Sequence, residues 1–389
     1  MNLEDIIRKT KTYYCLECGK CTAVCPVSRH NSNFSPRLML ERALMDSESE
    51  LIQDRELFSC LTCYACSHLC PSDVDYPLFT QKARTLAFAQ GQQGDCAHSG
   101  ILFSLMRLAS RTNIRQKRLD WLDGCRTSQR SEVLYFVGCA PYFEPIFQDM
   151  EVSPINIARS SLKILNALGI EPMLLPNERC CGHDLLWTGD VETFKKLAQL
   201  NAEMIKESGA KRVVFSCPEG YRTFKLDYPQ YVKLECEVLH ITEIIAQNLP
   251  RLPLHPRSKK GDNPKVKKVT YQDPCRLGRH LGIYEPPREI IKAIPGIKLV
   301  EMEHIAKDSI CCGTSVWTNC SSYSKAIRVE RLAEAKATGA ELLITACPKC
   351  QIHFKCAMVD KSSEKGPDVK VEVMDLVNVV ASALETKNE

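Results

Sequence analysis

The sequence predicts an α+β multidomain protein, in which an all-α (helical) N-terminal domain precedes two α/β, Rossmann-like domains related by an internal repeat. Three observations predict this class. Two identical cysteine runs stand within the first 70 residues, among segments of helical periodicity. After residue 132, short apolar runs alternate with helical patterns, which is typical of a parallel sheet flanked by helices. The same order of strands, helices and cysteine motifs then occurs a second time.

The composition is that of a globular protein with one outlier, cysteine. The 389 residues are 44% hydrophobic and 25% charged, and the net charge is only +4, so we expect no nucleic-acid partner. No run of 18 apolar residues occurs, so we expect no transmembrane segment. Residues 1–12 are charged and polar and do not resemble a signal peptide. The 22 cysteines therefore indicate metal ligands or redox centres of a cytoplasmic protein rather than disulfides.

Two C-x-x-C-x-x-C-x-x-x-C-P runs give the strongest signal in the chain. They consist of Cys15, Cys18, Cys21 and Cys25, and of Cys60, Cys63, Cys66 and Cys70. Three thiolates within seven residues can surround one [4Fe-4S] cubane, and in two-cluster proteins the fourth cysteine of each run serves the other cluster. We therefore expect two cubanes, one on Cys15, Cys18, Cys21 and Cys70, the other on Cys60, Cys63, Cys66 and Cys25. Zinc is the alternative, but it usually takes two C-x-x-C pairs without a third cysteine or a Cys-Pro ending.

The segments around these runs predict helices rather than the strands of a small β-rich ferredoxin. Residues 34–44 have helical spacing, with Ser35 as N-cap and Pro36 in the first turn, and residues 75–90 also predict a helix. We therefore expect residues 1–96 to form a helical ferredoxin domain. Residues 97–131 predict a helical connector, whose apolar face and following basic residues would pack on the protein itself or dock on a membrane surface or partner.

Two strand–helix units follow, at residues 132–252 and 266–389, joined by the Pro- and Lys-rich segment 250–265. The first unit predicts strands at 133–137, 172–175 and 212–215 and helices at 155–168 and 191–208. The second predicts strands at 266–271 and 341–345 and a helix at 323–338. Cysteines follow the strands in both units, which places them at the carboxyl edge where parallel sheets bind ligands. We expect the two edges to face a shared crevice.

Five cysteines of the second unit predict a centre with several irons. They are Cys275, Cys311, Cys312, Cys347 and Cys350. Adjacent cysteines do not fit a small tetrahedral zinc site comfortably, whereas they can bind two metals of a larger cluster. The alternatives are zinc on four of the five, and a thioredoxin-like Cys347–Cys350 pair.

The first unit repeats this pattern with one departure. Its matching cysteines are Cys139, Cys180, Cys181 and Cys217, whereas Gly220 stands at the position of the fifth. We expect this site to hold an altered cluster or another metal, or to serve only as scaffold.

The pattern C…CCG…C-x-x-C is similar to the cysteine-rich CCG domain of heterodisulfide reductases and their relatives. Residues 273–288 resemble the opening motif of that domain, residues 217–225 resemble another part of it, and the N-terminal half resembles the family's helical ferredoxin. The resemblance covers nearly the whole chain. It implies a noncubane [4Fe-4S] cluster that cleaves disulfides, with catalytic ligands Cys275, Cys311, Cys312, Cys347 and Cys350.

The function that this resemblance implies is an iron–sulfur oxidoreductase subunit acting on sulfur groups, which passes electrons through two cubanes to a cluster that reduces or forms a disulfide. We expect a thiol or disulfide substrate and a flavin-containing or cytochrome b-type partner, because no Gly-rich dinucleotide motif follows a strand. We expect the chain to lie in the cytoplasm, or at the inner face of the membrane if a partner subunit holds it there. The alternative is an electron-relay subunit of a glycerol-3-phosphate, glycolate or lactate dehydrogenase that delivers electrons to quinone.

Four further side chains near the motifs are candidates for roles at the site. His183 and His280 lie beside the CCG and D-P-C motifs and are candidate catalytic proton donors, with structural hydrogen bonding as the alternative. Arg276 and Arg279 would bind an anionic substrate group or form surface ion pairs.

Overall fold

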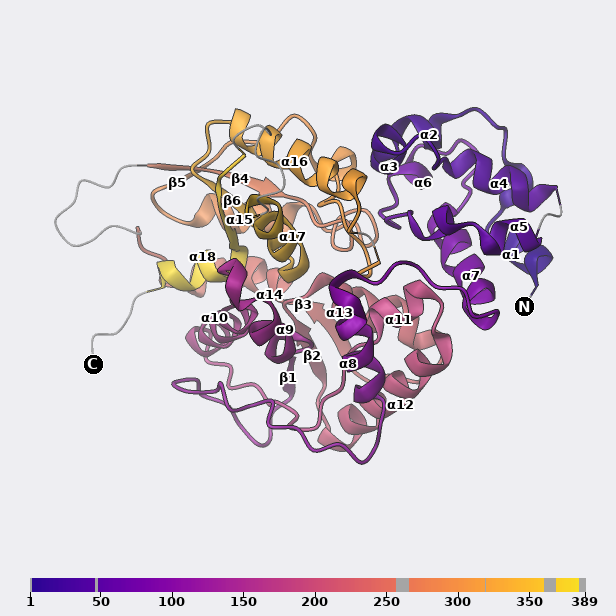
Figure 1. Cartoon of the computed structure of the whole chain (residues 1–389). Coiled ribbons are helices and arrows are strands. Elements are labelled where there is room, and N and C mark those ends of the chain that lie inside the picture. The colour runs from indigo at the N-terminus through magenta and orange to yellow at the C-terminus, as the bar shows by residue number, and fades with distance from the viewer. Residues whose placement is uncertain (1, 46–47, 257–265, 319, 360–368, 385–389) are drawn as a thin grey trace.

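The computed structural model describes residues 2–45, 48–256, 266–318, 320–359 and 369–384. A helical N-terminal part lies beside two α/β units, one built around β1–β3 and the other around β4–β7 (Figure 1). Residues 257–265 of the expected linker and 385–389 of the expected second unit lie outside the described residues. Among the described helices, none is long and apolar enough to cross a membrane.

The N-terminal part is helical, as predicted, and its described residues contain no strand. Its elements are α1 (Leu3–Lys9), η1 (Thr12–Tyr14), α2 (Lys20–Val24), α3 (Pro26–His30), α4 (Pro36–Leu44), α5 (Glu48–Gln53), η2 (Arg55–Phe58), α6 (Ala65–His68) and α7 (Tyr76–Ala89). The predicted cap of α4 is present, because Ser35 Oγ accepts a hydrogen bond from Leu38 N. Asp75 caps α7 in the same way through Leu78 N.

The connector is helical only at its start. η3 (Ala97–Gly100) and α8 (Ile101–Ala109) are followed by turns through residue 131, so the expectation of a helical connector is wrong beyond Ala109. The apolar face of α8 is buried against the protein, which favours internal packing over the membrane alternative. Arg118, expected among the basic docking residues, is buried and pairs with Glu178 at 2.6 Å. Arg118 also donates to the carbonyls of Glu178 and Gly138, so this non-helical segment is anchored to the first α/β unit.

The first α/β unit contains a parallel sheet in the order β1-β2-β3. Its strands are β1 (Val133–Phe136), β2 (Arg212–Phe215) and β3 (Glu237–His240). Its helices are α9 (Ala140–Phe147), η4 (Gln148–Met150), α10 (Pro154–Ala167), α11 (His183–Thr188), α12 (Val191–Ser208), α13 (Pro218–Arg222), the π-helix η5 (Thr223–Asp227), η6 (Tyr228–Gln230), α14 (Ile241–Gln247) and η7 (Leu249–Arg251). The strand expected at 172–175 is reduced to one parallel bridge between Met173 and Leu134, on the free side of β1.

The second unit contains a parallel sheet in the order β5-β4-β6-β7. Its strands are β4 (Lys267–Gln272), β5 (Ile297–Leu299), β6 (Leu342–Thr345) and β7 (Glu372–Asp375). Its helices are α15 (Glu285–Ala293), η8 (Ala306–Asp308), α16 (Ser322–Ala337), α17 (Pro348–Val359) and α18 (Leu376–Ala383). The Met173 bridge lies beside β1 as β5 lies beside β4, so the two sheets have the same strand order. The internal repeat is therefore present in the fold as well as in the sequence. A closer assignment to the Rossmann class stays a prediction.

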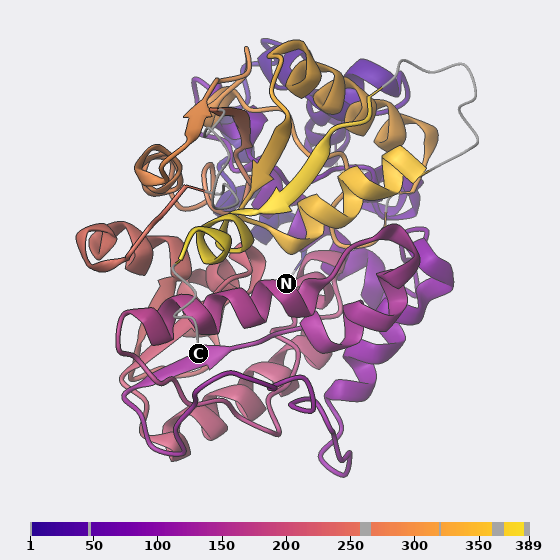
Figure 2. The same cartoon turned by 90° about the vertical axis from the view of Figure 1, so that its left-hand side faces the viewer.

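The three parts pack closely on one another. The two units meet where α18 lies against α10, and α14 contacts α15 (Figure 2). The N-terminal part contacts both units, through α7 against α11 and α3 against α16. Phe79 of α7 and Leu343 of β6 belong to one hydrophobic core, so the N-terminal part and the second unit are held by a shared apolar interior.

Candidate metal centres

The first cysteine run lies around a largely apolar cavity close to the surface. Three of its sulfurs share this cavity with the last cysteine of the second run: Cys15, Cys18, Cys21 and Cys70. Leu40, Val74 and Tyr76 are among the other lining residues, and Cys66 of the second run also reaches this cavity. Cys18 is exposed, so this group reaches the outside of the protein.

The second run is buried and includes the last cysteine of the first. Cys60, Cys63 and Cys66 are each 7–8% exposed. Burial, with a smaller contribution from the neighbouring Cys63 and Cys60, raises the pKa of Cys25 to about 12. The structure therefore brings Cys25 to the second run, while Cys70 lies with the first.

The two runs share an uncommon backbone conformation. The second cysteine of each run is flanked on both sides by residues with positive φ. These are Glu17 and Gly19 around Cys18, and Thr62 and Tyr64 around Cys63. Non-glycine residues adopt this conformation rarely, and mostly at functional sites. In the second run this conformation accompanies a hydrogen bond of 3.3 Å from Thr62 N to Cys60 Sγ. Such N–H donors stabilise the anionic sulfurs of an iron–sulfur cluster.

The second α/β unit gathers all five predicted cysteines at the carboxyl edge of its sheet. The thiols of Cys275, Cys311, Cys312, Cys350 and Cys347 contact one another in that order. Cys275 follows β4 and Cys347 follows β6, as expected. Hydrogen bonds from Cys311 and Cys350 lower the pKa of Cys312 to about 6, so this sulfur is the readiest to become a thiolate ligand.

The glycine of each CCG motif is required by the backbone. Gly313 has φ +82°, and a Cβ there would lie 2.6 Å from the carbonyl oxygen of Ser324. Gly182 has φ +78°, and its Cβ would lie 2.7 Å from the ring of Phe194. Only glycine combines this conformation with so close an approach. The sharp turn that follows the paired cysteines aims both sulfurs at the sheet edge.

The first unit brings four cysteines together, and Gly220 at the fifth position is crowded by an aromatic ring. Cys139 Sγ lies 3.6 Å from Cys180 Sγ, and Cys181, Cys217 and Gly220 line the same cavity. A Cβ on Gly220 would lie 3.2 Å from the Phe215 ring, whose centroid is 5.0 Å from that of Phe136. A side chain at position 220 would therefore press on Phe215 and require that ring to shift.

The spacing of the sulfurs tests whether one ion or several would fit. Two sulfurs on one zinc ion at about 2.3 Å are at most about 4.6 Å apart. Across the described ranges, the only three potential ligand atoms that all lie within 4.8 Å of one another belong to His183, Asp184 and Glu219. No three described cysteine sulfurs meet that condition, whereas a cluster with one sulfur on each of several irons accepts wider spacing. The donor sets therefore fit multi-iron clusters better than single zinc ions.

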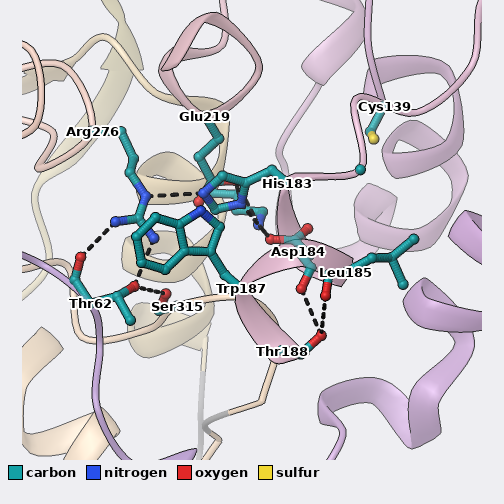
Figure 3. A network of polar contacts seen from close by, with 12 residues as sticks. Thr62, Cys139, His183, Asp184, Leu185, Trp187, Thr188, Glu219, Arg276 and Ser315 are labelled. Atoms are coloured by element: carbon teal, nitrogen blue, oxygen red, sulfur yellow. Dashed lines mark hydrogen bonds and ion pairs between the residues drawn. The ribbon is translucent and has the colours of Figure 1, made fainter. Parts of the chain in front are cut away.

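A buried ionic network separates the two units' sites (Figure 3). Lys349 Nζ lies 2.5 Å from Asp184 Oδ1 and 2.6 Å from Glu219 Oε2. His183 accepts a hydrogen bond of 3.0 Å at Nε2 from Arg276 Nε, so its Nδ1 donates to Asp184 at 2.9 Å. Lys349 pairs with both carboxylates, and Arg276, which donates to His183, brings a second positive charge next to them, so the close trio of His183, Asp184 and Glu219 has its counter-charges without a metal ion.

The predicted histidines face polar partners rather than cysteines. His280 accepts from Arg222 Nε at Nδ1 (2.9 Å), and its Nε2 lies 2.9 Å from the carbonyl of Thr62. Burial lowers the pKa of both His183 and His280, so both rings are neutral. With both nitrogens of each ring engaged, the geometry favours positioning roles.

The expectation that Arg276 and Arg279 form surface ion pairs is wrong. Arg276 is 3% and Arg279 is 6% exposed, and both donate hydrogen bonds to the N-terminal part. Sequence reasoning also missed Asp184, Glu219 and Lys349. The charged residue after each Cys-Pro pair was the available signal, since Glu219 and Lys349 occupy equivalent positions of the repeat.

Comparison with known proteins finds the same three parts. Residues 11–74 match the 4Fe-4S dicluster domain, and residues 133–225 and 269–355 each match the cysteine-rich domain called CCG. One subunit of the dihydromethanophenazine:CoB–CoM heterodisulfide reductase of Methanosarcina acetivorans is 33% identical over 279 residues, which cover 69% of this chain and 63% of that protein. The probable iron–sulfur-binding oxidoreductase FadF of Bacillus subtilis is 26% identical over 98% of this chain and 47% of its own length.

These matches confirm the predicted dicluster domain and the repeated cysteine-rich domains. The chain spans less than two thirds of the length of each of these two relatives. The crystal structure of a hypothetical protein from Helicobacter pylori has a TM-score of 0.52 and 11% identity, covering 99% of this chain and 72% of that one. That likeness concerns the fold alone.

Proposed function

The chain belongs to the family of heterodisulfide reductase subunits in which a 4Fe-4S dicluster domain is joined to two CCG domains, and from this premise we propose that it is the iron–sulfur oxidoreductase subunit of a heterodisulfide-reductase-like complex. The proposed cofactors are two [4Fe-4S] cubanes in residues 1–96 and one noncubane [4Fe-4S] cluster in residues 266–389. Bound there, they would supply one-electron transfer and the reduction or formation of a disulfide. Residues 97–131 connect the dicluster domain to the first CCG domain, at 132–252.

The observation that carries this proposal is the contact between the second cysteine run and the five-cysteine site. The hydroxyl of Thr62, next to Cys63, lies 3.2 Å from Ser315 Oγ in the segment that follows the paired cysteines. Arg279, four residues after Cys275, donates to the carbonyl of Cys63 at 2.6 Å. The proximity of the two ligand groups suits electron exchange inside one chain. The protein contributes the burial of four of these cysteines, with Cys275 half-buried, and the Lys349 ion pairs that join the two units.

The first CCG domain is proposed to hold a smaller metal centre on its four sulfurs. Gly220 offers no fifth ligand, and a side chain there would press on the Phe215 ring. The ligands of this centre would be Cys139, Cys180, Cys181 and Cys217. The two CCG domains would therefore differ in their chemistry, and only the second would act on sulfur groups.

A partner protein is proposed to exchange electrons at the first cysteine run. Tyr13, Tyr14, Leu16 and Leu69 are 43–69% exposed and flank Cys15 and Cys70. Apolar side chains grouped around a surface-reaching redox site are typical of a contact with another protein. A flavin-containing or cytochrome b-type subunit would fit this position, because the second cysteine run faces inward and is not accessible from outside.

Anaerobic purification with metal analysis and electron paramagnetic resonance tests the proposal. Three four-iron clusters predict roughly twelve irons per chain, or more if the first CCG domain binds iron. A thiol or disulfide should change the resonance signal that is lost in Cys312→Ser, while Cys320→Ser, which alters an exposed cysteine outside every motif, should leave iron and signal unchanged. A colourless, zinc-containing protein would refute the proposal.

The same experiment distinguishes the electron-relay alternative, which the incomplete first CCG domain favours. A relay subunit would hold its clusters, show no change with thiols or disulfides, and pass electrons to a quinone analogue. The reductase would respond to the disulfide.

A further inference from the structure

The second cysteine run is clamped onto the second CCG domain by two arginines that lie within five residues of Cys275. Arg276 donates to the carbonyl oxygen of Thr62 at 2.6 Å and to its hydroxyl at 2.7 Å. Its Nε bond to His183 and its position 4.6 Å from the Trp187 ring centroid hold the guanidinium in place (Figure 3). All these partners are buried, so the contact is part of the interior.

Arg279 spans the backbone of both ligand groups. Its Nε donates to the carbonyl of Cys63 at 2.6 Å, and its Nη1 donates to the carbonyl of Ser309, two residues before Cys311, also at 2.6 Å. One planar guanidinium therefore joins a ligand of the second cubane site to the segment that carries the paired cysteines. A lysine could not make both bonds in the same fixed geometry.

Neither arginine has a carboxylate partner in the part of the chain that the structure describes. Their hydrogen-bond acceptors are carbonyls, a hydroxyl and one imidazole nitrogen, that of His183. A buried charge without a counter-charge is costly, so an anion must lie nearby in the working protein. The groups that raise the pKa of Arg279 against the lowering effect of burial are led by the sulfurs of Cys63, Cys275 and Cys311. The negative charge of the two thiolate sets is the missing counter-charge.

We infer that Arg279, positioned with Arg276, raises the reduction potentials of both iron–sulfur centres between which it lies and holds them at a fixed separation. This inference rests on the proposed clusters. A reduced cluster carries one more negative charge than an oxidised one, so a nearby fixed cation favours the reduced form. Arg279 and Arg276 are positioning residues, since they contact the backbone and neighbouring side chains of the ligand segments.

Redox titration of the anaerobically purified full chain, followed by electron paramagnetic resonance, tests the inference. Arg279→Gln should lower the reduced-to-oxidised ratio of both neighbouring centres about tenfold at a given potential, which is about 59 mV for one electron. Arg279→Lys, which keeps the charge, should shift them far less. The centre on the first run should not move with either variant. Arg37→Gln is the matched control, because Arg37 lines the first-run cavity and should affect only that centre.

The outcomes separate this inference from the proposed function. Wild-type iron content with unchanged potentials in Arg279→Gln would overturn the inference and leave the clusters intact. A wild-type protein without clusters would refute the proposed function instead. If Arg279→Gln loses iron, Arg276→Gln carries the test, since its charge also acts on Cys275, and an unchanged potential of the five-cysteine centre would then overturn the inference.

Discussion

Replacing Lys349 by methionine should destabilise the pair of CCG domains, because it leaves two buried carboxylates without their cation. Lys349, Asp184 and Glu219 have side chains only 7%, 6% and 11% exposed, and the two N···O distances are 2.5 and 2.6 Å. Removing one partner of a buried ion pair costs about 3–5 kcal/mol. At about 2–4 °C per kcal/mol for a unit of 150–250 residues, the midpoint of thermal unfolding should fall by about 6–20 °C.

The pH dependence of the loss provides a second measurement. Burial alone would raise the pKa of Asp184, but Lys349 and then His183 hold it well below its usual range. A depressed carboxyl pKa contributes stability that is present above the unfolded value of about 3.9 and is lost as the pH falls through the folded pKa. Without Lys349 the sign reverses, since the uncompensated carboxylates bind protons more readily in the folded state. The free energy of unfolding of Lys349→Met should therefore decrease as the pH rises from 5 to 8.

Thermal unfolding followed by circular dichroism, at several pH values under anaerobic conditions, measures both effects. Lys195→Met is the control, because Lys195 forms an exposed i,i+3 pair with Glu192 and its loss should cost no more than about 0.5 kcal/mol. Adding Asp184→Asn and Glu219→Gln to the methionine variant should restore part of the stability. A midpoint for Lys349→Met equal to that of Lys195→Met would show that the network carries no buried-charge energy, and the reasoning would fail.

Three further predictions follow from single positions. Gly220→Cys should bind additional iron only when combined with Phe215→Leu, and metal analysis in which the single variant gains iron would contradict the steric argument. Burial raises the pKa of Asp375 to about 7, so the wild-type free energy of unfolding should decline by up to about 4 kcal/mol as the pH rises from 4 to 7. In urea unfolding, the free energy of Asp375→Asn should depend less on pH. Parallel pH dependences of the two proteins would contradict this. The Tyr64 ring is tilted by 58° against the His280 ring, with centroids 4.2 Å apart, so Tyr64→Gly, but not Tyr64→Phe, should speed hydrogen exchange in residues 60–66, and equal exchange would exclude a packing role.

Local sequence signals predicted the regular elements well. The strand expected at 212–215 and the helix expected at 191–208 coincide with β2 and α12, because apolar periodicity and flanking turns define both ends. The prediction of a helical connector was wrong in the segment that contains Arg118, which pairs with Glu178, sixty residues away. The prediction of surface roles for Arg276 and Arg279 failed for the same reason, since each donates to a carbonyl more than two hundred positions earlier, in the N-terminal part. Such contacts leave no trace in local periodicity.

The central ion pair explains why the repeat is asymmetric. Glu219 and Lys349 occupy the same position of the two units, directly after the Cys-Pro pair, and they meet at 2.6 Å. Two identical units facing each other would bring like charges together there, which buried sites do not tolerate. A fused chain can give the two positions opposite charges, and the neighbouring position differs as well, with Gly220 in one unit and Cys350 in the other. The difference in charge that pairs the units is therefore next to the difference in cysteine content. Under the proposed function, one substitution site would join the units and its neighbour would decide which unit holds the five-cysteine cluster.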